Sequence, residues 1–141
     1  KTINYVGEAA INLHISYLPF NKGTHPNVWS NFENTISGVT IHLIDEGLDT
    51  GKILFQKEIF INKKEHTFLS SYLLLIREIE KLFKINWKYL RTNESSGWSQ
   101  IGEGSFHYAK DLNIVKPYLK LGWETNIQDA LDGYNQNKKL F

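Results

Sequence analysis

Three polar residues near the ends of two apolar runs have the types and spacing that could carry out chemistry on a carbonyl group. Asn12 and His14 are two residues apart, so on a strand their side chains point to the same face. An amide and an imidazole placed together can stabilise negative charge on a carbonyl oxygen and move a proton. Asp49 follows the second run and could tune the histidine or accept a proton. Because α/β sites lie beyond the carboxyl ends of strands, we interpret the runs as two strand ends feeding one site for acyl or formyl transfer to an amine.

Each of these residues also has a structural interpretation. Asn12 could bond a neighbouring loop, and the acids of the turn could bond their own backbone. His14, His42 and Asp49 could instead form a two-histidine, one-carboxylate iron site. His42 lies inside a predicted strand, however, and the spacing is not a compact ligand motif, so no metal is expected. Three histidines without visible partners are interpreted as caps or surface residues: His25, His66 and His107.

The elements that must position these residues follow from composition and hydrophobic periodicity. Apolar runs, mostly rich in β-branched residues, predict three strands, the first of them buried inside the sheet: 9–13, 38–44 and 52–61. Apolar spacing, proline and capping residues predict helices over 25–34, 67–91, 112–121 and 126–131. The intervening segments 1–8, 15–24, 45–51 and 92–104 are predicted as loops or turns, and the tail 135–141 is expected to fray.

Composition limits the functions that this chain could have. The 141 residues are enough for one domain, which we take as 1–141, and the net charge of +1 gives no basic face for nucleic acid. The absence of cysteine excludes disulfides, thiolate catalysis and cysteine-based zinc sites. No apolar run approaches the length of a membrane span. We therefore expect a cytoplasmic α/β domain with neither a nucleic acid nor a membrane partner, and a homo-oligomer is compatible with this.

Two sequence blocks closely resemble the folate-dependent formyltransferases. The first is N-x-H-x-S-x-L-P over residues 12–19, followed by Gly23; the second joins GVTIH at 38–42 to DEGLDTG at 45–51. The resemblance covers about residues 9–61. It implies a three-layer, Rossmann-like formyltransferase domain that transfers a formyl group from N10-formyltetrahydrofolate to an amine.

The resemblance also assigns roles to individual residues. In the family, the asparagine and histidine of the motif face the formyl oxygen and the aspartate assists proton transfer, which implies catalytic roles for Asn12, His14 and Asp49. Backbone around the second block contacts the pterin, so the implied cofactor-binding residues are Leu43, Ile44, Asp45, Gly47 and Leu48. The implied residues on the path of the amine substrate are Ser16, Lys22 and Gly23.

Further features bear on which member of the family this is. The block HPNVWS at 25–30 and, more loosely, GSFHYAKD at 104–111 resemble the enzymes that formylate nucleotide-linked amino sugars. A methionyl-tRNA or glycinamide ribonucleotide type is the alternative, and aromatic residues that could stack on a base or simply pack are Trp98, Phe106 and Tyr108.

Two departures from the family pattern stand out. Lys22 occupies a place where the family commonly has arginine, and lysine cannot make the bidentate anion contact. Only eleven residues precede Asn12, and the chain begins with Lys1 and has no methionine. We therefore expect the N-terminal half of the family domain to be absent, which leaves a catalytically silent fragment or binding module as a second hypothesis.

Overall fold

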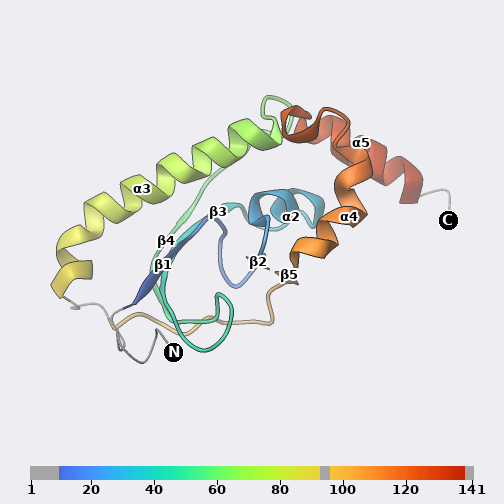
Figure 1. Cartoon of the computed structure of the whole chain (residues 1–141). Coiled ribbons are helices and arrows are strands. Elements are labelled where there is room, and N and C mark those ends of the chain that lie inside the picture. The colour runs from blue at the N-terminus through green and yellow to red at the C-terminus, as the bar shows by residue number, and fades with distance from the viewer. Residues whose placement is uncertain (1–9, 93–95, 139–141) are drawn as a thin grey trace.

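The centre of the molecule is a three-stranded antiparallel sheet (Figure 1). The structure is a computed structural model that describes residues 10–92 and 96–138, so the predicted loop at 1–8 lies outside the described residues. Strands β1 (Ile11–His14), β3 (Gly38–Leu43) and β4 (Ile53–Glu58) lie in the order β1-β3-β4. The three predicted strands are therefore confirmed, with ends that differ by up to three residues.

The edge position of β1 corrects the expectation that this strand is buried inside the sheet. Within the described residues β1 pairs with β3 alone, and the Leu13 side chain is 38% exposed. The strand β3 lies in the middle and is buried on both faces from Gly38 to His42. The central strand of this sheet is thus β3, which carries the GVTIH block.

The direction of the strands corrects a second expectation, that the site lies beyond carboxyl ends that meet at one edge. β1 and β3 are antiparallel, so Leu43 at the end of β3 pairs with Ile11 at the start of β1. The last residue of β1, His14, pairs instead with Thr40. The segment after β3 must therefore fold back along β1 before it can bring Asp49 to His14.

The long helix α3 (Phe68–Thr92) packs against all three strands and confirms the helix predicted over 67–91 (Figure 1). Thr67 caps its start: the Thr67 Oγ1 accepts the N–H of Ser70 at 3.0 Å, and the Ser70 Oγ accepts the N–H of Thr67 at 2.9 Å. The side chains that α3 buries recur at three- to four-residue steps, at Phe68, Ser71, Leu75, Glu78 and Ile79.

The remaining helices lie beyond one end of the sheet (Figure 1). The helix α2 (Pro26–Phe32) confirms the helix predicted over 25–34, and it is one residue shorter at its start and two residues shorter at its end. The predicted helix 112–121 is wrong in its second half: α4 covers Leu112–Val115, and a 3-10 turn, η3 (Lys116–Tyr118), follows. Pro117 explains the break, because its ring cannot continue an α-helix. Further 3-10 turns are η2 (Ala109–Asp111) and η4 (Gly122–Glu124).

The last helix is longer than predicted. α5 covers Ile127–Lys138, so residues 135–138 of the predicted tail are helical, whereas its residues 139–141 lie outside the described residues. Its first turn is capped by Asn126, whose Oδ1 accepts the N–H of Gln128 at 2.9 Å. The buried residues of α5 are Ile127, Ala130 and Leu131, which explains why the polar remainder carried no helical hydrophobic pattern.

A two-stranded parallel sheet joins two segments that were predicted as loop and connection. β2 (Lys22–Gly23) pairs with β5 (Phe106–His107), and the Lys22 N–H donates to the Ser105 carbonyl at 2.9 Å. Strands of two residues are too short for a period-2 pattern, so the sequence carries no signal for them. This small sheet fixes the loop after β1 against the C-terminal part of the chain.

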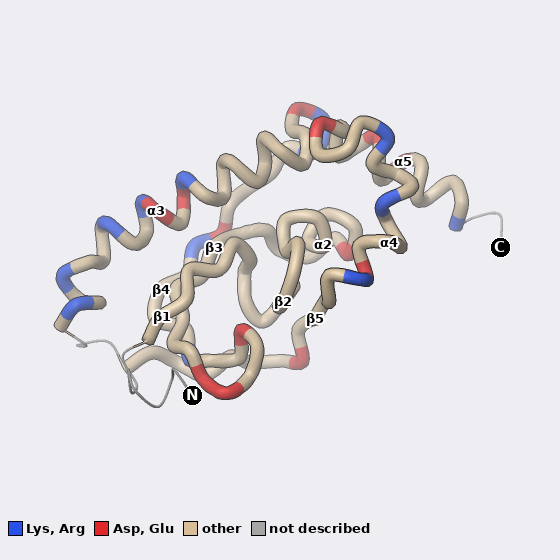
Figure 2. The backbone as a smooth tube through the Cα atoms, viewed as in Figure 1, with Lys and Arg blue, Asp and Glu red and all other residues tan. Residues whose placement is uncertain are grey.

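Charged residues are spread unevenly over the described part of the chain. Lys and Arg residues lie along α3, and acidic residues gather on the segment after β3 (Figure 2). Across residues 10–92 and 96–138, no helix has the length and apolar character needed to cross a membrane.

Candidate active site

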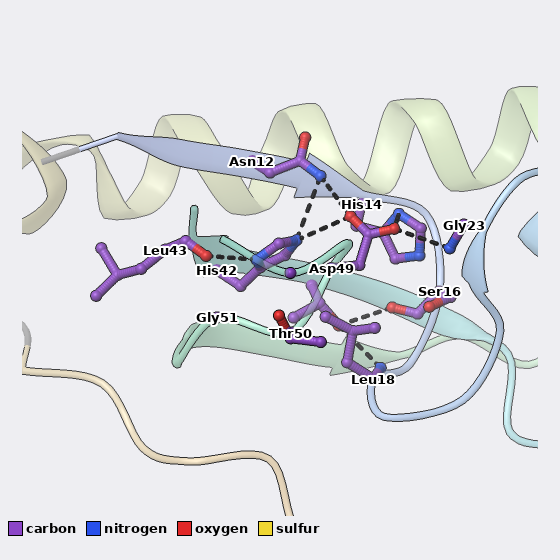
Figure 3. Close-up of polar contacts among 12 residues, drawn as sticks. Asn12, His14, Ser16, Leu18, Gly23, His42, Leu43, Asp49, Thr50 and Gly51 are labelled. Atoms are coloured by element: carbon purple, nitrogen blue, oxygen red, sulfur yellow. Dashed lines mark hydrogen bonds and ion pairs between the residues drawn. The ribbon is translucent and has the colours of Figure 1, made fainter. Parts of the chain in front are cut away.

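The pairing of β1 with β3 builds one polar face. Asn12 lies directly opposite His42, and His14 lies opposite Thr40. Because side chains alternate across a strand, these four side chains share one face of the sheet. The turn after β3 folds back over that face and brings Asp49 onto it (Figure 3).

The carboxylate of Asp49 is the centre of this cluster. Its Oδ1 accepts from Asn12 Nδ2 at 2.9 Å, and its Oδ2 accepts from the Gly23 N–H at 2.9 Å. Two imidazoles flank it, with His42 Nε2 3.4 Å from Oδ1 and His14 Nδ1 3.7 Å from Oδ2. Asp49 is only 8% exposed, so its negative charge is stabilised by the N–H groups of Asn12 and Gly23 more than by water. The structure therefore brings together Asn12, His14 and Asp49, as predicted.

His42 belongs to the same cluster, although the sequence interpretation considered it only as a metal ligand. Its Nδ1 donates to the Leu43 carbonyl at 2.7 Å, which fixes the tautomer and leaves Nε2 to accept from Asn12 Nδ2 at 3.2 Å. The side chain is 2% exposed. The alternation of Thr40 and His42 in the GVTIH block could have indicated this placement, but only once β3 is known to pair antiparallel with β1.

Asp49 and His14 lie close enough for each group to affect the pKa of the other. Burial opposes ionisation of Asp49, but the neighbouring imidazole of His42, the charge of His14 and the Gly23 N–H together lower its pKa to about 2. Burial lowers the pKa of His14, and the charge of Asp49 offsets part of this. At neutral pH the site therefore holds an ionised carboxylate beside a mainly neutral imidazole.

Both candidate donors to a substrate already have protein partners. The two amide hydrogens of Asn12 are directed to Asp49 and to His42. His14 Nε2 donates to the Asn21 carbonyl at 3.2 Å, so in the neutral ring its Nδ1 is a bare acceptor facing Asp49. A carbonyl oxygen that takes a hydrogen bond from Asn12 must replace one of these partners, and the longer contact, to His42, is the weaker one.

The five residues predicted to contact the cofactor lie on one continuous segment, from the end of β3 into the turn that holds Asp49. The turn is closed by the Asp45 carboxylate, whose Oδ1 accepts from the Gly47 N–H at 3.0 Å and from Thr50 Oγ1 at 2.6 Å. Two apolar side chains stay exposed there, Ile44 at 36% and Leu48 at 53%. An exposed apolar edge beside a buried polar cluster fits a flat, partly apolar ring system.

The three residues predicted to contact the amine substrate are placed differently from one another. Gly23 donates to Asp49 and adopts a φ of +87°, and a Cβ there would lie 2.2 Å from the His107 carbonyl oxygen. Lys22 is half-buried on β2. Ser16 is 1% exposed and its hydroxyl donates to the Phe20 carbonyl at 2.8 Å, so its placement is that of a loop support. Substrate contacts by these residues stay predictions.

The other histidines only partly match the expected roles of cap or surface residue. His107 stacks on Trp29 with ring centroids 3.9 Å apart, and its Nε2 lies 2.8 Å from Glu33 Oε1, so it is neither a cap nor a surface residue. His25 is the N-cap residue of α2 but makes no side-chain cap, and it stacks on Trp123 at 5.6 Å. His66 Nδ1 lies 3.1 Å from Ser70 Oγ, near the start of α3.

The iron-site alternative can be compared with the geometry directly. His14, His42 and Asp49 do come together, but the imidazoles are 6.2 Å apart and the carboxylate lies between them, bonded to Asn12 and Gly23. Among residues 10–92 and 96–138, no group of three or more histidine, aspartate or glutamate side chains has an arrangement that could hold a metal ion.

The family follows from this cluster and from comparison with known proteins. A model of the formyl transferase family matches residues 1–73, just over half of the chain. The chain therefore belongs to the formyl transferase family, and its α/β fold is that of the formyltransferase Rossmann-like domain. The matched range contains Asn12, His14, His42 and Asp49.

Within the family, the chain is similar to proteins that act on nucleotide-linked sugars. The formyltransferase PseJ from Anoxybacillus kamchatkensis, solved with UDP-4,6-dideoxy-4-formamido-L-AltNAc and tetrahydrofolate, is 43% identical with a TM-score of 0.87. That match covers 92% of this chain and 68% of PseJ. The dTDP-4-amino-4,6-dideoxyglucose formyltransferase of Mycobacterium tuberculosis is 31% identical over 110 residues, covering 78% of this chain and 47% of that protein.

A methionyl-tRNA formyltransferase also matches, over a shorter range. The protein from Thermodesulfovibrio yellowstonii is 46% identical over 82 residues, which are 52% of this chain and 27% of that protein. The chain therefore spans about half, or less, of the length of these curated relatives.

Proposed function

We propose that the protein is an N-formyltransferase that transfers the formyl group of N10-formyltetrahydrofolate to the amino group of a nucleotide-linked amino sugar. The observation that carries the proposal is the buried Asp49 carboxylate, bonded to Asn12 and flanked by His14. The likeness to PseJ over 92% of this chain supports the sugar class. The cytoplasmic location expected from the sequence is part of the same proposal.

The donor supplies an electrophilic formyl carbonyl, and the residues present fit its chemistry. The oxygen of that carbonyl gains negative charge when an amine attacks. Asn12 Nδ2 can stabilise this charge by donating a hydrogen bond to the oxygen in place of its contact with His42. The exposed side chains of Ile44 and Leu48 offer an apolar surface to the ring system of the donor. We propose these contacts between the donor and the segment after β3.

The attacking amine forms a bond to the formyl carbon and must lose a proton, while the bond from that carbon to N10 of the donor breaks and N10 takes up a proton. His14 and Asp49 divide the proton transfer between them. His14 is mainly neutral because of its burial, so its Nδ1 has a lone pair that can accept the proton. The imidazolium that results is stabilised by the ionised Asp49 at 3.7 Å. A carboxyl with a pKa of about 2 is a poor final proton acceptor, so we assign Asp49 the role of charge partner and His14 that of base.

A cavity of about 380 Å³ supports the placement of the rest of the substrate. Its lining begins at Ile15, the residue after His14, and includes the stacked pair His25 and Trp123 together with Tyr72. Trp123 and Tyr72 are 42% and 40% exposed, so aromatic faces are available to a sugar or base ring. We propose that a sugar or base ring of the nucleotide-sugar occupies this cavity. The cavity does not place the amine, because Ile15 packs against the apolar core whereas His14 lies on the polar face of the sheet.

Formyl-transfer assays with three candidate acceptors test this function. The protein is incubated with N10-formyltetrahydrofolate and, in separate reactions, a UDP-linked 4-amino sugar, a dTDP-linked amino sugar and methionyl-tRNA. Formylation of a nucleotide-sugar with no formyl-methionyl-tRNA supports the proposal, and the reverse favours the methionyl-tRNA type. Binding of 5-formyltetrahydrofolate without turnover of any amine favours the catalytically silent binding module.

The cavity has its own test. Trp123→Ala is expected to raise the KM for the nucleotide-sugar about fivefold while the KM for the folate stays unchanged, because stacking on this ring is worth about 1 kcal/mol. An equal rise in both KM values, or in neither, would count against the placement.

A further inference from the structure

Gln100 lies in the segment between α3 and β5, and its side chain reaches the turn that carries Asp49. Its Nε2 donates to the Asp49 carbonyl at 2.8 Å and to the Gly51 carbonyl at 3.0 Å. Two carbonyl acceptors fix the orientation of the amide, because only its NH₂ end can donate. Its Oε1 is buried and has no partner in the part of the chain that the structure describes. Gln100 thus directs both of its donors at one turn.

The turn holds Asp49 in an unfavourable backbone conformation. Asp49 has a φ of +55°, in the left-handed region that residues other than glycine seldom adopt. The preceding residues are exposed, with Leu48 at 53%. A residue in that conformation persists where its surroundings determine it, and the two bonds from Gln100 fix the backbone on both sides of Thr50.

The segment that carries Gln100 is anchored at both ends. Before it, Trp98 pairs with Ile53 of β4: the Trp98 N–H donates to the Ile53 carbonyl at 2.9 Å, and the Ile53 N–H donates back at 2.8 Å. After it, the Ser105 carbonyl accepts the N–H of Lys22 at 2.9 Å. The segment therefore links the Asp49 turn to the β2 strand whose Gly23 N–H bonds the Asp49 carboxylate.

We propose that Gln100 is a positioning residue, which holds the Asp49 turn so that the carboxylate stays on Asn12 and on the Gly23 N–H. Gln100 contacts the backbone of Asp49 and acts through it. The catalytic consequence rests on the proposed formyl transfer, whereas the positioning of Asp49 does not.

Gln100→Met tests the proposal, because methionine keeps the length of the side chain and removes both donors. Displacement of the turn is expected to lower kcat about 10- to 100-fold with KM for the nucleotide-sugar little changed, as small misplacements of reacting groups do. The second readout is the titration of His14, followed by NMR of ¹⁵N-labelled imidazole. The pKa of His14 is expected to fall below its wild-type value, because the charge of Asp49 that raises it has moved away.

Asn126→Ala is the control for a general loss of stability. It removes the hydrogen bond that Asn126 Nδ2 donates to the Lys64 carbonyl. It also removes the cap of α5, and both lie on a different part of the molecule. This variant is expected to lower the melting temperature while kcat and the His14 titration stay at wild-type values. An unchanged His14 titration in Gln100→Met, or an unchanged kcat in an active protein, would overturn the proposal. If the wild type is inactive, the proposed function has failed, and the titration alone still decides the positioning.

Discussion

At the scale of single residues, the charge of Asp49 is the feature on which the rest of the site depends. Asp49→Asn keeps the shape of the side chain but removes the charge that stabilises a protonated His14. We expect kcat to fall at least about 100-fold, in the range that general acid–base groups contribute. The matched control is Asp132→Asn, which neutralises an exposed carboxylate on α5 and is expected to leave kcat unchanged. Turnover retained by Asp49→Asn would exclude the assigned role.

The same two residues predict how stability depends on pH. The folded-state pKa of His14 lies below 6.5, so the stability it contributes is present above pH 6.5 and is lost as the pH falls through its folded pKa. Asp49 also has a lowered pKa, so its contribution is present above 3.8 and is lost toward about 2. Urea unfolding at a series of pH values should show the first loss in the wild type and a smaller one in His14→Gln. Equal pH dependence in both proteins would contradict this account.

The sequence predicts part of this residue-level picture. Asn12 and His14 could be paired because a spacing of two on a strand needs no knowledge of the fold. The place of His42 depends on the antiparallel register with Asn12, and that of Gln100 depends on a segment that crosses back to the Asp49 turn. Long-range pairing of this kind leaves no local pattern, so neither contact could be predicted.

At the scale of elements, the turn after β3 requires Gly51, its last residue, to lie close to the end of β3. A Cβ on Gly51 would lie 1.7 Å from the Leu43 carbonyl oxygen. Gly51→Ala is therefore expected to lower the free energy of unfolding by about 1–3 kcal/mol, the usual cost of overpacking. Gly133→Ala is the control, because Gly133 lies inside α5 and its Cβ would make only a 3.5 Å contact with Tyr118.

The outcome for the control has the opposite sign. Alanine is favoured over glycine inside a helix by about 0.5–1 kcal/mol, so Gly133→Ala should stabilise the protein slightly. Both values come from urea unfolding at neutral pH. Equal effects of the two substitutions would show that the contact with Leu43 does not constrain the turn.

Elements with a strong periodic pattern were predictable, and the others were not. α3 was predicted because its apolar side chains repeat over the whole helix. α4 ends before Pro117, and a 3-10 turn replaces part of the second half of the predicted helix 112–121. The end of α5 was missed because its last turns are polar and exposed, and β2 and β5 because two residues carry no period.

At the scale of the whole molecule, the order of the predicted strands and helices indicates the α/β class, and the motifs indicate the formyltransferase domain within it. Periodicity alone predicted three strands and a long helix, without their direction or order. The N-x-H and DEGLDTG blocks indicated the family, which the family model confirms over residues 1–73. The expectation that a further half of the domain precedes Lys1 stays a prediction.

The most direct test of the account is a formyl-transfer assay on the wild type and Asp49→Asn side by side. The substrates are N10-formyltetrahydrofolate and a UDP-linked 4-amino-4,6-dideoxy sugar, the unformylated form of the compound bound to PseJ. The product is detected by mass spectrometry as the formamido sugar. We predict that the wild type and Asp132→Asn form it at equal rates and that Asp49→Asn forms at most about one hundredth as much. No product from the wild type, or equal product from Asp49→Asn, would contradict the central claim.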